Sequence, residues 1–154
     1  MSPPEPFEPL PIDTVVFRLA KEDSKFLPPG ALSPNADIWA PSSGDEAEGK
    51  ERGRPPGVSV WDVRRTSPAQ AITIRFGEKP PPTRAFAAKV QSILAAGEQH
   101  GRTLHAFADP LPVERGPGAD GHALIEGIAR PIGVSRVEHK QLLDALVQIL
   151  QELR

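Results

Sequence analysis

The chain has 154 residues, with 18 basic and 20 acidic side chains, four histidines and no cysteine. This length suffices for one domain with a buried core, and a net charge of −2 creates no field that would gather nucleic acid or an anionic membrane. The absence of cysteine excludes a disulfide framework, a thiol nucleophile and a cysteine-ligated metal. We therefore expect a single soluble domain with neither nucleic acid nor membrane as a partner.

The first segment, residues 1–11, has prolines at positions 3, 4, 6, 9 and 11. This composition favours an extended polyproline conformation and predicts a terminal arm in front of a domain that spans residues 12–154. Acidic residues and prolines occupy the places where a cleaved signal peptide has a basic and then an apolar region. The sequence predicts a protein made in the cytoplasm, and export by a machine that cleaves no leader is equally compatible with it.

Runs of β-branched, aromatic and alternating residues predict about five mostly antiparallel strands. Residues 58–63 and 71–76 show the strictest alternation, and a polar turn with a proline separates them, so we expect them to pair at the centre of the sheet. The spacing of apolar residues in the segment 122–129 also fits a short helix. The expected strands are residues 14–20, 58–63, 71–76, 103–108 and 122–129.

Two helices are expected to pack on this sheet, which makes the fold α+β. The first begins at Thr83, follows helical spacing through Phe86, Val90 and Ile93, and stops at Gly101. The second begins with the capping box Ser135 to Glu138. Its apolar stripe consists of Leu142, Leu143, Leu146, Ile149, Leu150 and Leu153.

A long loop is expected at residues 21–57, which contain six prolines and no extended hydrophobic period. Phe26 and Trp39 are too apolar for a bare linker, so the first half of the loop should pack over the sheet. The charged run Asp45–Arg54 is predicted to be mobile and solvated.

Known motifs are scarce in this chain. Gly116, Gly118 and Gly121 match the spacing G-x-G-x-x-G, but prolines precede and interrupt the run and no helix is expected after it, so it is typical of a turn. The histidines show neither an i, i+4 pair nor a third carboxylate ligand, and we expect no metal. His105 and His122 lie on predicted strands and could meet across the sheet.

Four polar residues on different parts of the predicted sheet could serve one reaction, namely Arg18, Ser59, His122 and Glu126. His122 and Glu126 are four positions apart on one strand and share a face. In a reaction of a nicotinamide nucleotide, Arg18 with His122 would bind the cofactor, Ser59 would orient it, and Glu126 would stabilise the charge that develops as nicotinamide leaves. The expected cofactor is NAD.

The order of Arg18, Ser59 and Glu126 resembles the Arg-Ser-Glu arrangement of ADP-ribosyltransferases. In addition, the segment Gly57–Asp62 is similar to a small-Ser-Val-aromatic-Asp segment in bacterial type VI secretion toxins with an ADP-ribosyltransferase-like fold. Leu124 stands where the second acid of the Glu-x-Glu motif would be, and the chain has no tyrosine. The resemblance implies a small NAD-using toxin or protein-modifying enzyme, with a cognate immunity protein or a target protein as its partner.

Two other hypotheses stay open. A non-enzymatic protein-binding module, such as an immunity factor, an inhibitor or an accessory domain, fits the near-neutral charge and the scattered polar residues. A subunit that assembles through the C-terminal apolar stripe is the third.

Overall fold

A computed structural model describes residues 2–154 as one six-stranded sheet with the strand order β4-β5-β2-β1-β3-β6. Every neighbouring pair is antiparallel, so the predicted α+β class is confirmed, with six strands in place of about five. The strands are β1 (Val15–Lys21), β2 (Val58–Asp62), β3 (Thr83–Lys89), β4 (His105–Ala108), β5 (His122–Glu126) and β6 (Gln151–Leu153).

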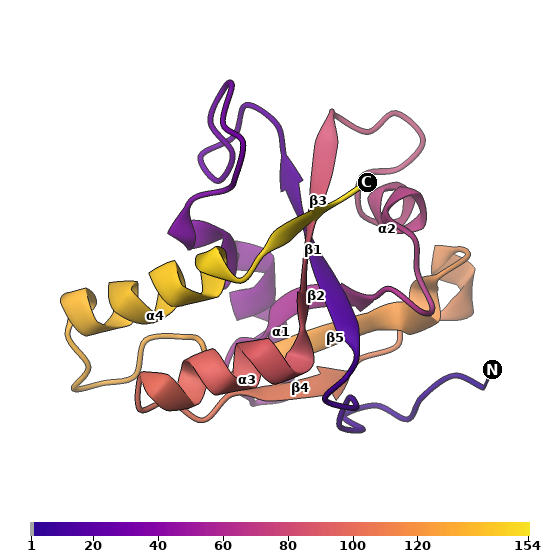
Figure 1. The fold of residues 1–154 in the computed structure, drawn as a ribbon. Coiled ribbons are helices and arrows are strands. Elements are labelled where there is room, and N and C mark those ends of the chain that lie inside the picture. Colours follow the sequence, from indigo (N-terminus) through magenta and orange to yellow (C-terminus); the bar gives the residue numbers. More distant parts are fainter. Residues whose placement is uncertain (1) are drawn as a thin grey trace.

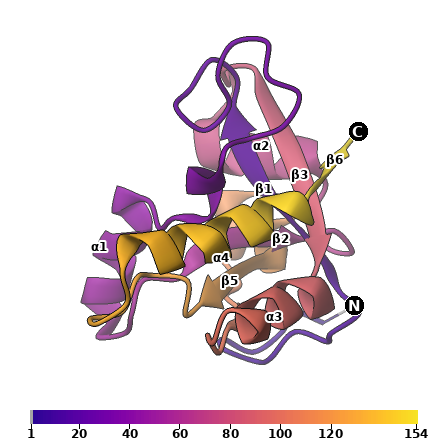
Figure 2. The same cartoon turned by 60° about the vertical axis from the view of Figure 1, so that its left-hand side comes forward.

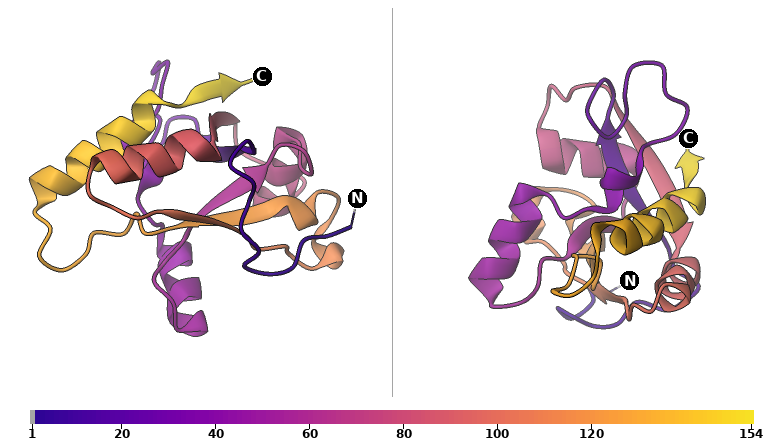
Figure 3. Two further views of the ribbon diagram at one scale, coloured as in Figure 1. Left: turned by 60° about the horizontal axis from the view of Figure 1, so that its bottom comes forward. Right: turned by 90° about the vertical axis from the view of Figure 1, so that its left-hand side faces the viewer.

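Four α-helices cover the two faces of this sheet. They are α1 (Ser43–Arg52), α2 (Pro68–Phe76), α3 (Val90–Gln99) and α4 (Arg136–Gln148), with 3-10 turns η1 (Ala36–Trp39), η2 (Val113–Arg115) and η3 (Ala119–Gly121). Figure 1 shows α2 and α4 on opposite sides of β1 and β3, and Figure 2 shows α3 and α4 side by side in front of the strands. Figure 3 shows α1 on the face away from α3 and α4. No helix within residues 2–154 is both long and apolar enough to cross a membrane.

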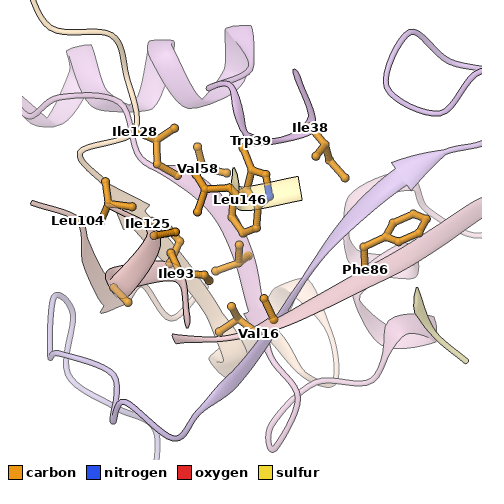
Figure 4. Close-up of a cluster of buried hydrophobic side chains, with 14 of the residues drawn as sticks. Val16, Ile38, Trp39, Val58, Phe86, Ile93, Leu104, Ile125, Ile128 and Leu146 are labelled. Atoms are coloured by element: carbon orange, nitrogen blue, oxygen red, sulfur yellow. The ribbon is translucent and has the colours of Figure 1, made fainter. Parts of the chain in front are cut away.

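The larger core lies between the sheet and the layer formed by α3, α4 and η1 (Figure 4). Val58 and Val60 of β2 point into it, whereas Trp61 belongs to a smaller cluster on the other face, with Phe17 and Ala71. Because side chains alternate along a strand, Ser59 shares the face of Trp61. Polar side chains of β2 are thereby directed to the side of the sheet where α1 and α2 lie.

Residues 71–76 form most of α2, so the predicted strand there is wrong. The Ser67 side chain accepts a hydrogen bond from the Gln70 amide, the Gln70 side chain accepts one from the Ser67 amide, and Pro68 occupies the first turn. This capping box and a proline at the helix start outweigh six residues of alternation. Ala71 and Ile74, three positions apart, then face the sheet.

Residues 83–89 form β3, so the helix predicted from Thr83 is wrong in its first half. The strand pairs with β1 over its whole length, from Val15 opposite Lys89 to Lys21 opposite Thr83. Four consecutive buried residues, Ala85 to Ala88, show that the strand is covered on both faces, and this hides the alternation by which an exposed strand is recognised. The second half of the prediction is confirmed as α3, and Gly101 has the expected left-handed φ of 68°.

The charged run predicted to be mobile forms α1. Ser42 and Asp45 cap its start reciprocally, and Gly53 ends it with a φ of 67°. The helix has no apolar stripe because its buried positions are Asp45 and Gly49. A Cβ at Gly49 would lie 2.9 Å from the Arg54 carbonyl oxygen and 2.9 Å from Pro56 Cα, so this helix packs through its backbone.

The two ends of the chain pair with the sheet. The α4 helix begins as predicted, with the Ser135 side chain accepting from the Glu138 amide, but it ends at Gln148 and the last residues form β6 beside β3. At the other end, the backbone of residues 7–10 runs along β4. The Phe7 amide donates to Ala108 O at 2.7 Å, and the Leu10 amide donates to Ala106 O at 2.9 Å. The proline-rich segment thereby covers an edge strand.

Candidate functional site

Two adjoining hollows lie on the sheet face that carries Ser59 and Trp61, with volumes of ≈ 180 Å³ and ≈ 250 Å³. They share four lining residues, Ser42, Ser59, Trp61 and Arg75, and we call them together the α1–α2 cleft. The smaller hollow is also lined by Gly44, Asp45, Glu48, Ile74, Leu111, Arg115 and His122. The larger hollow is also lined by Arg18, Leu19, Ala20, Lys21, Ser24, Lys25, Phe26, Ile38 and Phe76.

Arg18 fills a gap between two strands of the sheet. The pairing of β1 with β2 registers Val16 and Phe17 and then stops, so the next carbonyl oxygens of β2 lack ladder partners from β1. The Arg18 guanidinium donates from Nη1 to Ser59 O at 2.7 Å and from Nε to Ile38 O, and its Nη2 lies 3.7 Å from an Asp45 oxygen. Arg18 therefore connects β1, β2 and η1.

The pKa of Arg18 is lowered to about 10, mainly by burial; the charge of Asp45 opposes this shift and the nearby charge of Arg75 contributes to it. At this pKa the side chain stays protonated at neutral pH. A buried cation needs a counter-ion and hydrogen-bond acceptors, and Asp45 with the two carbonyl oxygens supplies them. The direct contacts of Arg18 are thus with the protein itself.

Asp45 joins α1 to the sheet. One carboxylate oxygen accepts the Ser59 hydroxyl at 3.0 Å, and the other accepts the Ser42 amide at 2.8 Å. Sequence reasoning missed Asp45, although the Ser42-x-x-Asp45 spacing is a capping-box signal that could have marked the helix start. Ser59 lines both hollows and uses its hydroxyl as a donor to Asp45, so its oxygen can still accept a hydrogen bond from a ligand.

His122 is held by a buried carboxylate. Its Nδ1 lies 3.0 Å from the backbone oxygen of Asp109 and 3.0 Å from Asp109 Oδ2, and Asp109 Oδ1 lies 3.1 Å from Arg52 Nη1. The ring packs edge-on against Trp61, with a centroid distance of 5.0 Å, because these residues are register partners on β2 and β5. Among residues 2–154, no hydrogen bond is made by His122 Nε2.

Asp109 is charged in this arrangement. Burial alone would raise the pKa of Asp109, but the hydrogen bond and charge of His122, with the charge and hydrogen bond of Arg52, lower it below its ordinary value. A carboxylate at Nδ1 fixes the tautomer in which Nδ1 carries the proton and Nε2 can accept one. The pair therefore has the geometry of a general base. Asp109 was not among the predicted site residues, since only its place before Pro110 marks it in the sequence.

Glu126 lies on the same sheet face but outside the cleft. Its two oxygens each accept a hydrogen bond at 2.8 Å from Arg54, whose guanidinium lies 4.4 Å from the centroid of the Phe7 ring. A separate small hollow, which Asp45 and Glu48 also line, contains this pair. The structure thus brings Arg18, Ser59 and His122 to one cleft and places Glu126 in an ion pair beside it.

The remaining candidates have structural positions. His105 is exposed and lies opposite Glu126 on β5, so His105 and His122 do not meet. The glycine run contains the 3-10 turn η3, leads directly into β5 and opens no α-helix, as expected for a turn, and Thr66 donates to Gly118 O at 2.6 Å. Within residues 2–154, no group of three or more histidine and acidic side chains is arranged to hold a metal ion.

Comparison with known proteins gives no relative, because no family model, curated protein or solved structure matches this chain significantly. The function is accordingly argued from the cleft.

Proposed function

We propose that this protein is an enzyme that cleaves the nicotinamide–ribose bond of NAD in the α1–α2 cleft, in the role of a small toxin or protein-modifying enzyme. The observation that carries the proposal is the Asp109–His122 pair. A histidine fixed through Nδ1, with a free Nε2 beside a cleft, is the usual arrangement of a general base. The other walls supply a hydroxyl at Ser59, an aromatic edge at Trp61 and unpaired cations.

Each group has a step in the reaction. The bond between the nicotinamide nitrogen and the ribose carbon breaks, and its electron pair leaves with nicotinamide. Water, or a hydroxyl of an acceptor protein, forms the new bond to that carbon and gives its proton to His122 Nε2. Asp45, whose carboxylate orients Ser59, contributes negative charge near the positive charge that develops on the ribose.

This assignment makes His122 the proton acceptor and takes charge stabilisation away from Glu126. Both oxygens of Glu126 are bound by Arg54, so the charge of this carboxylate is already compensated within the protein. Arg18 likewise becomes a residue that positions Ser59 through its backbone oxygen. The predicted cofactor is kept, and the predicted roles of Arg18, His122 and Glu126 change.

The test incubates the purified protein with NAD and measures the nicotinamide released by chromatography. We expect His122→Asn and Asp109→Asn to lower the rate by about 10²-fold or more, since a positioned general base contributes about 10²- to 10⁴-fold. Lys140→Ala, on the outer side of α4, is the matched control and should leave the rate unchanged. No release by the wild type, or equal release by His122→Asn, would refute the proposal.

The alternative, a non-enzymatic protein-binding module, is favoured by a different surface. A groove of ≈ 620 Å³ beside α4 is larger than either hollow of the cleft, and Arg130, Arg136, Lys140 and the apolar edge of Leu143 line it. A partner bound there should be lost when Arg136 and Lys140 are both changed to Glu. Mass measurement of the natively purified complex checks this, and a protein that remains a free monomer in both forms contradicts it.

A further inference from the structure

The side chains of two arginines in the cleft form no salt bridge and no hydrogen bond within residues 2–154. Most arginines of the chain pair with a carboxylate, as Arg52 does with Asp109 and Arg54 with Glu126. The two arginines, both lining the smaller hollow, are Arg115 and Arg75, whose guanidinium lies 5.6 Å from the centroid of the Phe76 ring. They come from different elements, the last turn of α2 and the end of η2, so the fold brings together two cations that it does not neutralise.

The charges around these two arginines leave an excess of positive charge. Asp45 also lines the hollow, but Arg18 accompanies it. Glu48 is then the one acid that faces the two free cations, since no ion pair or hydrogen bond of its side chain occurs within residues 2–154. The nearness of Arg75 also lowers the pKa of Arg18, which shows that like charges are held close together. Such an arrangement is stabilised when an anion binds between the cations.

We propose that Arg75 and Arg115 bind the diphosphate of a nucleotide in the smaller hollow of the α1–α2 cleft. A diphosphate carries several acceptor oxygens, and planar guanidinium groups on two walls can each take two of them. The N-terminus of α1 strengthens the attraction for a diphosphate, because Ser42 and Gly44 line the same hollow and the partial positive charge of a helix lies at its N-terminus.

The rest of the nucleotide has a place in the adjoining hollow. Phe26, Phe76 and Trp61 line the larger hollow and offer apolar and aromatic surface to a base. Glu48 can accept hydrogen bonds from ribose hydroxyls. The inference deepens the function proposed above by naming the residues that hold the ligand, and it rests on that function only for the choice of NAD among diphosphate nucleotides.

Calorimetric titration tests the site without turnover. The ligands are ADP, inorganic pyrophosphate and adenosine, and the proteins are the wild type, Arg75→Gln, Arg115→Gln and Arg154→Gln. Arg154, exposed after β6, is the matched control for loss of one arginine charge. We expect ADP and pyrophosphate to bind the wild type, adenosine to bind more weakly than ADP, and each cleft variant to lose about tenfold in affinity for ADP, with Arg154→Gln unchanged.

Three outcomes would overturn the inference. They are no binding of ADP or pyrophosphate to the wild type, equal affinity for adenosine and ADP, and unchanged ADP affinity in both cleft variants. Binding lost in the Arg75 and Arg115 variants with no nicotinamide release supports the inference and refutes the proposed function. Nicotinamide release by the wild type, with an unchanged KM for NAD in both variants, supports the proposed function and refutes the inference about the diphosphate site.

Discussion

Arg18 and Arg75 line the same hollow of the cleft, yet the structure gives them opposite roles, and replacing each by methionine separates these roles. Arg18 is 11% exposed and donates to the carbonyl oxygens of Ile38 and Ser59. Arg75 is exposed, and its side chain makes no hydrogen bond or ion pair among residues 2–154. Arg18→Met should therefore act on folding, and Arg75→Met on ligand binding.

The magnitude follows from the groups that are left unpaired. Methionine keeps much of the apolar stem of Arg18 but leaves two carbonyl oxygens without donors, and an unsatisfied buried acceptor costs about 1–3 kcal/mol. Loss of the cation beside Asp45 adds to this cost. We expect the free energy of unfolding to fall by about 2–4 kcal/mol, which for a domain of this size lowers Tm by about 5–15 °C. Arg75→Met should change the free energy of unfolding by less than about 0.5 kcal/mol.

Urea unfolding followed by circular dichroism measures both variants, and titration with ADP provides the second reading. The expected pattern is a double dissociation, with stability lost in Arg18→Met and ADP affinity lost in Arg75→Met. Equal stability of the two variants, or a larger loss in Arg75→Met, would refute the view that Arg18 connects β1, β2 and η1.

Three further predictions, with four variants, test other parts of the structure. Glu126→Gln should lower thermal stability, because it weakens both hydrogen bonds to Arg54. The rate of nicotinamide release should stay within about twofold of the wild type, and a large loss of rate in a folded variant would show that Glu126 takes part in catalysis. Gly97→Ala should destabilise by about 1–3 kcal/mol, since its Cβ would lie 2.6 Å from Leu104 Cγ. Gly44→Ala in α1, whose Cβ would make an ordinary contact of 3.7 Å with Ser42 Oγ, should be neutral or stabilising by less than about 1 kcal/mol; urea midpoints compare the two. Burial, together with the charges of Arg102 and Arg130, lowers the pKa of His139, so protonation is easier in the unfolded chain and stability should fall as the pH drops below about 6.5. His139→Gln should reduce the loss between pH 7 and pH 5, and equal pH profiles of variant and wild type would contradict this.

The elements that could be predicted from the sequence are those whose apolar pattern is local. β1 and β2 alternate visibly, and α4 carries both a cap and a stripe, so they were placed within a few residues. The prediction was wrong at β3 because this strand is buried on both faces and rich in alanine, a residue that also suits helices. The prediction missed α1 because polar groups attach this helix to the sheet, and the spacing of hydrophobic residues carries no information about polar contacts.

The same distinction explains the site. Ser59 and His122 were recognisable as polar residues on predicted strands, and the structure places them in one cleft. Asp45 and Asp109 were not recognisable, since each acts through a contact with a residue far along the chain or in another element. Arg75 was expected on a strand face, and its place in the cleft depends on α2 being a helix.

The attachment of α1 makes the fold and the cleft depend on one another. Asp45 holds the start of α1 to Ser59, and Arg52 at its end holds Asp109, the residue that orients His122. A change that releases α1 would therefore remove the wall of the cleft and weaken the fixation of the general base at the same time. The pKa of Asp109 is lowered in the folded protein, so its attachments to Arg52 and His122 contribute stability that is lost as the pH falls through that lowered value, whereas the apolar layer of α3 and α4 is not affected in this way. The site is thus assembled on the less apolar side of the sheet, and the fixation of His122 follows the charge state of Asp109.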